Sequence, residues 1–435
     1  MLTRSAWKSL ERHLNGRLRF SLSSALHLEE IAIRAIAHSR GRNRPNAELA
    51  QELIRDFPGS LEVIARLMSS WLEAQRELLS RLSRDQTAIQ KKFFRTVATL
   101  RVVSIRPGMS DPHDRGRSVT LIEFTGRRRV VYKPRPCCGE QIWYEGLSWL
   151  GLNGTGCWFR RPGILPRKNY AWMEFLPVRG CASSNSVHGF YFRWGAQSAL
   201  AQVLGVCDLH RENWIALGSH PVLVDAEMMG AAKSNRGERR PIDSRMARAF
   251  LNTGLIPLTA RDGVGRYRAV APFDMMSFGR PPTHCWPRYK GRLQAPARYV
   301  DDLVNGFEAA ARVLEKPALG KSFFNQVLLP LPSVRVRRLL RATAEYAGIL
   351  RDSLDATKMI SSAERWRWLK QECCATVATR RIAHAEAVAL RRCDIPRFTG
   401  SARSLSWPQF CTAVAELKCS ARVLRRRVLL VSRGG

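Results

Sequence analysis

Apolar residues recur every three or four positions over much of the first hundred residues, the spacing of a helix with one buried face. The clearest run is residues 60–82, with apolar positions at Ile64, Leu67, Met68, Trp71, Leu78, Leu79 and Leu82. Pro58, Gly59 and Ser60 precede this run and are typical of a helix start. The pattern predicts a long amphipathic helix in this part of the chain.

The period changes from helix to strand after a stretch rich in glycine, proline and aspartate at 106–118. Residues 118–124 and 129–133 are rich in β-branched side chains and flank a Thr-Gly-Arg-Arg turn, so they predict a β-hairpin. Further along, the same reasoning predicts a helix, a strand and a second helix, over residues 140–152, 170–177 and 190–205 in turn.

A second hairpin is predicted by the run NWIAL-GSHP-VLVD, with its turn at 218–221. In this register Trp214 pairs with Asp225 across the ladder. Asn213 and Asp225 then lie together at the open end of the hairpin. The hairpin therefore brings a carboxylate and an amide oxygen to one place.

The stretch GVCDLHRENW, residues 205–214, delivers Asp208 and His210 to the same end. Carboxylate and amide oxygens suit Mg²⁺, which commonly stays bound to substrate phosphates as well. Two other interpretations stay open: half a zinc site at Cys207-x-x-His210, for which we find no second half, and a polar helix end without chemistry.

The chain is irregular over 230–300 and helical in pattern from about residue 300. If VRRLLRATAEY is helical, four residues fall on one face, namely Val336, Leu340, Thr343 and Ala347. The order of elements suits an α+β fold with a two-lobed catalytic core and helical additions at both ends. We expect four regions: a helical one over 1–105, a β-rich lobe over 106–180, a second lobe over 181–300 and a helical region over 301–435.

Phosphoryl transfer needs a cation clamp, a base for the acceptor hydroxyl and a lysine on the phosphates. Lys133 ends the first hairpin, where a kinase-like fold carries that lysine, and Glu140 or Glu145 on the next helix could pair with it. The loop at 106–118 could cover phosphates, although it lacks the GxGxxG of protein kinases. A single lysine after a strand is usually a surface residue, but the ordered combination favours a kinase-like site.

Basic residues outnumber acidic ones by 71 to 36, a formal net charge of +35. Such a field attracts nucleic acid, nucleotide phosphates, anionic lipid or an acidic peptide, unless it only reflects an arginine-rich coding bias. We see no signal-peptide core and no run of the roughly 20 apolar residues that would span a membrane. We therefore expect a cytoplasmic protein whose 11 cysteines are reduced.

Several motifs together resemble the dehydratase domain of class II lanthipeptide synthetases, the LanM type. In chain order they are DPHDRGRSVTLIEFTGRRRVVYKPRP, YAWMEF, GVCDLHRENWIALGSHPVLVDAE, NTGLIP, VRRLLRATAEY and CDIPRF. The resemblance runs from about residue 50 to 410. It implies a fold like that of lipid kinases, and an enzyme that phosphorylates Ser and Thr of a precursor peptide with ATP and then eliminates the phosphate.

The resemblance also implies a role for each matching residue. Lys133 would hold ATP phosphates, Asp208 would serve the acceptor hydroxyl, and His210 would support its loop. Asn213 and Asp225 would hold Mg²⁺. The remaining matches are a functional carboxylate at Glu227, the phosphate-loop motif at Asp111 and His113, and the elimination residues Arg337 and Thr343.

The expected partner is a precursor peptide with a leader, which is often acidic in this class and would be drawn by the positive charge. The zinc-binding cyclase of full-length synthetases has no motif here, so we expect a stand-alone dehydratase with a separate LanC-like cyclase. Nucleic acid is not an expected partner. Two alternatives remain: a peptide or small-molecule kinase without elimination, and a non-catalytic basic protein that binds an acidic peptide or nucleic acid.

Overall fold

The computed structural model describes residues 2–40, 51, 53–95, 100–230, 253, 255, 283–338, 340–375, 379–402 and 405–433. Helices and short antiparallel strands are both present there, which confirms the α+β class. Most of the region 230–300 lies outside the described residues, and only Thr253 and Leu255 of the NTGLIP motif lie within them.

The chain forms two compact units, each assembled from separate stretches of sequence. The first unit contains residues 1–136, 163–175 and 339–398. The second unit contains residues 137–162, 176–338 and 399–435.

A five-stranded antiparallel sheet is the centre of the first unit, in the order β1-β2-β3-β5-β4. Its strands are β1 (Val102–Arg106), β2 (Thr120–Phe124), β3 (Arg128–Lys133), β4 (Ile164–Pro166) and β5 (Ala171–Glu174). The predicted first hairpin is β2–β3, in which Ile122 pairs with Val130. Gly126 forms its turn with a left-handed φ of 73°, a conformation that glycine adopts without steric cost.

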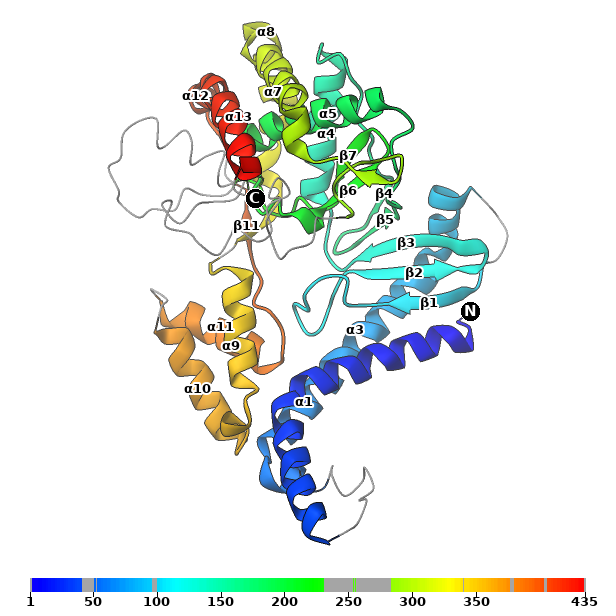
Figure 1. The fold of residues 1–435 in the computed structure, drawn as a ribbon, viewed down its shortest axis with the longest axis vertical. Helices are drawn as coiled ribbons and strands as arrows, with labels where there is room; N and C mark the ends of the chain where they lie inside the picture. The colour runs from blue at the N-terminus through cyan, green and yellow to red at the C-terminus, as the bar shows by residue number, and fades with distance from the viewer. Residues whose placement is uncertain are drawn as a thin grey trace. The chain divides into compact units, whose positions relative to one another are not determined.

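Two long helices, α1 (Arg4–Arg40) and α3 (Gly59–Ile89), pack with this sheet around one apolar core (Figure 1). The predicted helix at 60–82 is confirmed as α3, which buries Leu67, Trp71, Leu78 and Leu82. A polar contact also ties α3 to the sheet, because the buried carboxylate of Asp85 accepts hydrogen bonds from the side chains of Tyr170 and Trp172, at 2.8 Å each.

The rest of the first unit is a helical cluster with its own apolar core. It contains α9 (Thr343–Ser353), α10 (Ser362–Cys374) and α11 (Arg380–Arg391), packed with parts of α1 and α3. Arg365 is fully buried in it and donates to the carbonyls of Leu390 and Arg391 at the end of α11, as well as to that of Ser353. A buried guanidinium is tolerated there because helix ends leave carbonyls without intrahelical partners.

In its described residues the second unit contains mainly helices and three two-stranded sheets. Its helices are α4 (Cys138–Leu152), α5 (Ser184–Leu204), α7 (Val300–Glu315), α8 (Pro317–Phe323), α12 (Trp407–Ala415) and α13 (Leu417–Arg433), and its strand pairs include β8 (Arg288–Tyr289) with β9 (Arg292–Leu293). The predicted helices at 140–152 and 190–205 are confirmed as α4 and α5, and the predicted strand at 170–177 is β5 of the first unit. Helix α5 begins earlier than predicted because the Ser183 hydroxyl caps it, accepting from the Ser186 amide at 3.2 Å.

One predicted element is wrong. Residues Arg335–Arg338 form strand β10, paired with β11 (Phe398–Ser401), and helix α9 begins only at Thr343. Val336 and Thr343 therefore do not share a helical face. An alternating Arg-Val-Arg segment is compatible with either period, and pairing with a strand more than sixty residues away decides between them.

Candidate functional site

The hairpin that carries the site is β6 (Trp214–Leu217) with β7 (His220–Leu223). Its turn has only two residues, Gly218 and Ser219, so Trp214 pairs with Leu223 and the predicted pairing with Asp225 is wrong. Gly218 has a left-handed φ of 60°, which permits a shorter turn than the one predicted. The open end still gathers the predicted residues, because the Val224 amide donates to the Asn213 carbonyl at 2.8 Å and Asp225 follows directly.

The loop between α5 and the hairpin presents Asp208 in a left-handed conformation, with φ at 65°. This backbone is uncommon for a residue other than glycine and persists only where neighbours hold it. The Asn213 amide group does so, since its Nδ2 donates to the Asp208 carbonyl at 2.8 Å and lies 3.3 Å from His210 Nε2. The amides on either side are also held: Cys207 donates to Met228 at 2.9 Å and Leu209 donates to Thr253 at 2.8 Å.

The Asp208 carboxyl lies in a cluster of charged groups. Burial raises its pKa, and the carboxylates of Asp225 and Glu227 add to this effect, whereas His210 and Arg337 oppose it. Asp208 Oδ1 is 3.9 Å from His210 Nε2. A carboxylate with a raised pKa accepts a proton more readily than an ordinary one, as a general base requires.

Arg337 enters this cluster from β10 and is tied to Glu227 twice. Its NH1 donates to Glu227 Oε1 at 2.9 Å, and its backbone amide donates to the Glu227 carbonyl at 2.8 Å. Its Nε and NH2 are buried and have no hydrogen-bond partner among the described residues. Buried donors without partners are costly, so their presence on a cation fits a site for an anionic group.

This ion pair joins residues 110 positions apart in the sequence. The motifs identify Glu227 and Arg337 separately, but no spacing between them predicts that they touch. The structure thus adds a connection that sequence reasoning missed.

The donors available for a metal ion are oxygens. One is the amide oxygen of Asn213, whose nitrogen donates to the Asp208 carbonyl, and the other is the carboxylate of Asp225, just after the same hairpin. Mg²⁺ keeps waters and substrate phosphates as ligands, so two protein oxygens fit it. Zinc fits poorly: burial raises the pKa of the Cys207 thiol to about 12, and the residues the structure describes include no group of three His, Cys, Asp or Glu that could hold a metal.

Four of the predicted residues belong to the first unit. Lys133 ends β3 and is buried, with Ala171 of β5 as its strand partner. Asp111 is exposed, whereas His113 Nδ1 lies 2.7 Å from the Ile395 carbonyl oxygen. Thr343 is the first residue of α9 and half-buried.

The two carboxylates considered as partners of Lys133 both lie on α4 in the second unit. Glu140 is fully buried and Glu145 is exposed. Glu140 lies in the first turn of α4 and is buried there, so its surroundings differ from those of Glu145, although the sequence offered both as candidates. In all, the structure brings together six predicted residues in the second unit: Asp208, His210, Asn213, Asp225, Glu227 and Arg337.

Comparison with known proteins gives one family and one curated relative. The model of the family described as "Domain of unknown function (DUF4135)" matches residues 57–401. The Lacticin 481/lactococcin biosynthesis protein LcnDR2 of Lactococcus lactis subsp. lactis is 22% identical over 341 residues, which cover 69% of this chain and 36% of that protein. The chain thus spans little more than a third of its relative's length.

A search of the described helices finds none that combines the length and the apolar character needed to cross a membrane. The family match covers most of the chain and includes every site residue discussed above. Together with the curated relative, it confirms the resemblance to LanM-type synthetases that the motifs indicate, and the chain belongs to the DUF4135 family.

Proposed function

We propose that this protein dehydrates Ser and Thr residues of a ribosomally made precursor peptide, by ATP-dependent phosphorylation followed by elimination of the phosphate, on a lipid-kinase-like core. The observation that carries the proposal is the buried Arg337, whose Nε and NH2 have no hydrogen-bond partner in the part of the chain that the structure describes, while its charge acts on Asp208. A base for a hydroxyl and a cation for a phosphate are two of the groups that this sequence of reactions needs. The relative's printed role in lacticin 481 and lactococcin biosynthesis points to the same kind of substrate.

In the first step, the Ser or Thr hydroxyl oxygen bonds to the γ-phosphorus of ATP while the bond from that phosphorus to the β–γ bridging oxygen breaks, and ADP leaves. The hydroxyl proton passes to Asp208, whose raised pKa favours its acceptance. His210 and Asn213 support the left-handed backbone that presents the carboxyl. Lys133, which is buried at the end of β3, would bind the ATP phosphates.

Mg²⁺ bound by Asn213 and Asp225 would neutralise charge on the ATP phosphates. In the second step, a base takes the proton from Cα, the electron pair of that C–H bond forms the Cα=Cβ double bond, and the Cβ–oxygen bond breaks as inorganic phosphate departs, which leaves dehydroalanine or dehydrobutyrine. Arg337 would bind the departing phosphate through its Nε and NH2, while Glu227 holds the other side of the guanidinium. Thr343 is the second elimination residue that the resemblance implies.

The test is to incubate the full chain with ATP, Mg²⁺ and the precursor peptide encoded beside its gene, and to follow the peptide mass. We expect loss of water from the peptide. Asp208→Asn should slow all modification by about 100-fold or more, the size of a general-base contribution. Arg337→Met should leave phosphorylated peptide, because only the second step needs its free donors.

Two neighbouring residues provide matched controls. Glu212→Gln changes an exposed carboxylate of the same loop, and Arg335→Met changes an exposed arginine of the same strand, so both should dehydrate the peptide normally. A phosphorylated product from the unaltered protein would identify a kinase without elimination. An unmodified peptide would favour the non-catalytic binding role, and normal dehydration by Arg337→Met would refute the role of that residue.

A further inference from the structure

The loop that carries Asp111 and His113 ends in a tight turn with unusual backbone geometry. His113 and Arg117 exchange two backbone hydrogen bonds of 2.8 Å, and the three residues between them, Asp114, Arg115 and Gly116, are all left-handed, with φ of 46°, 69° and 75°. Successive amide groups in such a turn form a concave site for an anion.

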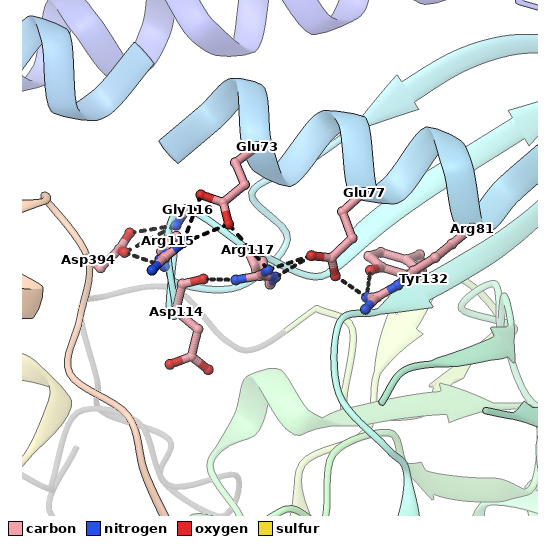
Figure 2. Close-up of polar contacts among 9 residues, drawn as sticks. All are labelled: Glu73, Glu77, Arg81, Asp114, Arg115, Gly116, Arg117, Tyr132 and Asp394. Atoms are coloured by element: carbon pink, nitrogen blue, oxygen red, sulfur yellow. Dashed lines mark hydrogen bonds and ion pairs between the residues drawn. The ribbon is translucent and has the colours of Figure 1, made fainter. Parts of the chain in front are cut away.

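A buried side chain of the same unit occupies this concave site. Asp394, which is 1% exposed, accepts from the Arg115 amide at 2.7 Å and from the Gly116 amide at 3.0 and 3.1 Å (Figure 2). The carboxylate therefore provides the negative charge that this turn needs, from a residue 278 positions away in the chain.

The residues after Asp394 continue the contact along the loop. The Ile395 amide donates to the Pro112 carbonyl at 2.8 Å, and the Ile395 carbonyl lies 2.7 Å from His113 Nδ1. Arg397 and Asp114 form an ion pair at 3.4 Å. Residues 394–397, which we call the anchor segment, thus hold the turn by backbone and side chains together.

Helix α3 holds the other flank of the turn. Arg115 pairs with Glu73 at 3.1 Å, and Arg117 Nε donates to Glu77 at 3.0 Å (Figure 2). Glu77 also pairs with Arg81, which donates to the hydroxyl of Tyr132, the residue before Lys133. A continuous polar network therefore links the turn to the strand that carries the expected phosphate-binding lysine.

Keeping Asp394 buried has a cost. Burial raises the pKa of its carboxyl to about 6, although Arg17 and the two amides of the turn act in the opposite direction. A residue that is costly to bury in its charged form, and that closes a loop rather than an apolar core, is a candidate for a functional role.

We propose that Asp394 is a positioning residue, which fixes the 111–117 loop in the conformation that binds the nucleotide phosphates. The identity of the ligand, a nucleotide, rests on the proposed function. The positioning role of Asp394 rests on the contacts described above. Asp394 does not itself bind the nucleotide, because the turn amides use both of its oxygens.

The experiment compares the full chain with Asp394→Asn, and with Asp352→Asn as a matched control at an exposed aspartate of α9. An asparagine has one acceptor oxygen, and its amide nitrogen faces the donors of the turn. We expect amide hydrogen exchange in 113–117 to accelerate at least tenfold in Asp394→Asn. KM for ATP should rise about fivefold or more while kcat changes less than twofold. A purely structural role would instead lower kcat and the melting temperature together, with KM unchanged.

Arg397→Gln is a milder second variant, because it removes the ion pair to Asp114 and leaves the Asp394 carboxylate in place, and it should also raise KM for ATP. Provided that the unaltered protein turns over ATP, either of two results for Asp394→Asn would overturn the inference. One is unchanged amide hydrogen exchange in the turn, and the other is a KM for ATP equal to that of the unaltered protein. If the unaltered protein binds no ATP, both the proposed function and the role of the 111–117 loop in binding phosphates are refuted. The exchange data then still decide whether Asp394 holds the loop.

Discussion

Asp208 and Asp394 are both carboxyls whose pKa is raised by burial, and both depend on left-handed backbone. Asp208 adopts that conformation itself, so its side chain projects from a loop held by Asn213. Asp394 lies at a turn of three such residues and accepts hydrogen bonds from the amides of two of them, Arg115 and Gly116. Left-handed backbone thus presents the Asp208 carboxyl to a cluster of charged groups, whereas at Asp394 it encloses the carboxyl.

The pKa of Asp394 has a consequence for stability. Its folded value of about 6 exceeds the ordinary 3.8, so the folded protein binds this proton more tightly than the unfolded chain does. The free energy of unfolding therefore gains a contribution as pH falls from about 6 to about 4, of at most about 3 kcal/mol. The contribution is absent at pH 7 and above.

Urea unfolding at pH 4.5 and 7.5 measures this effect, with Asp394→Asn as the reference because its side chain does not titrate. Relative to that variant, the unaltered protein should be more stable at the lower pH. The comparison cancels other groups, among them Asp85 and Glu62, whose pKa values are lowered and which act in the opposite direction. A pH-independent difference would contradict the burial cost assigned to Asp394.

At the scale of elements, the α5–α7 contact supports the site loop, because α5 leads directly into Gly205 and Asp208. The two helices approach closely through glycines. A Cβ on Gly195 would lie 1.8 Å from the Leu303 carbonyl oxygen, and one on Gly306 would lie 1.8 Å from that of Phe192.

Gly195→Ala should therefore lower the free energy of unfolding by about 3 kcal/mol or more, because neither backbone can move aside without losing packing. Gly348→Ala in α9 is the matched control: its Cβ meets nothing within 4 Å, so it should stabilise the protein by about 0.5–1 kcal/mol. Thermal unfolding of both variants checks the pair of expectations. Equal effects would mean that α5 and α7 do not approach as closely as the glycines indicate.

The elements also show how far the sequence could predict this protein. The α3 helix and the β2–β3 hairpin depend on local periodicity and turn residues, and both are predicted closely. The β6–β7 register was wrong because a turn of two residues and one of four fit the same apolar pattern. Strand β10 was missed because its partner β11 is distant in the sequence.

In the candidate site, too, the sequence predicts contacts between residues close together in the chain and misses those between distant ones. Asn213 and Asp225 could be brought together because a short hairpin links them, even with its register misjudged. No local pattern could predict that Glu227 holds Arg337, or that Asp394 reaches Arg115 and Gly116, because these contacts depend on the tertiary fold.

At the scale of the whole molecule, the net charge of +35 should govern the encounter with an acidic leader peptide. Raising salt from about 0.1 M to about 1 M shortens the Debye length from about 10 Å to about 3 Å, so the Kd for such a peptide should rise roughly tenfold or more. Fluorescence anisotropy of a labelled leader checks this. A leader with glutamines in place of its glutamates is the control, and equal salt dependence of the two would show that the charge plays no part in recognition.

The interleaving of the two units has a consequence for the synthesis of the chain. The first unit needs residues 1–136, 163–175 and 339–398, so β4 and β5 complete its sheet early, whereas its helical cluster lacks α9, α10 and α11 while the middle of the chain is being translated. At about 5–20 residues per second, residue 339 follows residue 136 by roughly 10–40 s. During that interval the apolar residues of α1 and α3 that belong to the core of the helical cluster lack their partners on α9, α10 and α11. The nascent chain should therefore depend on chaperones until nearly all of it has left the ribosome.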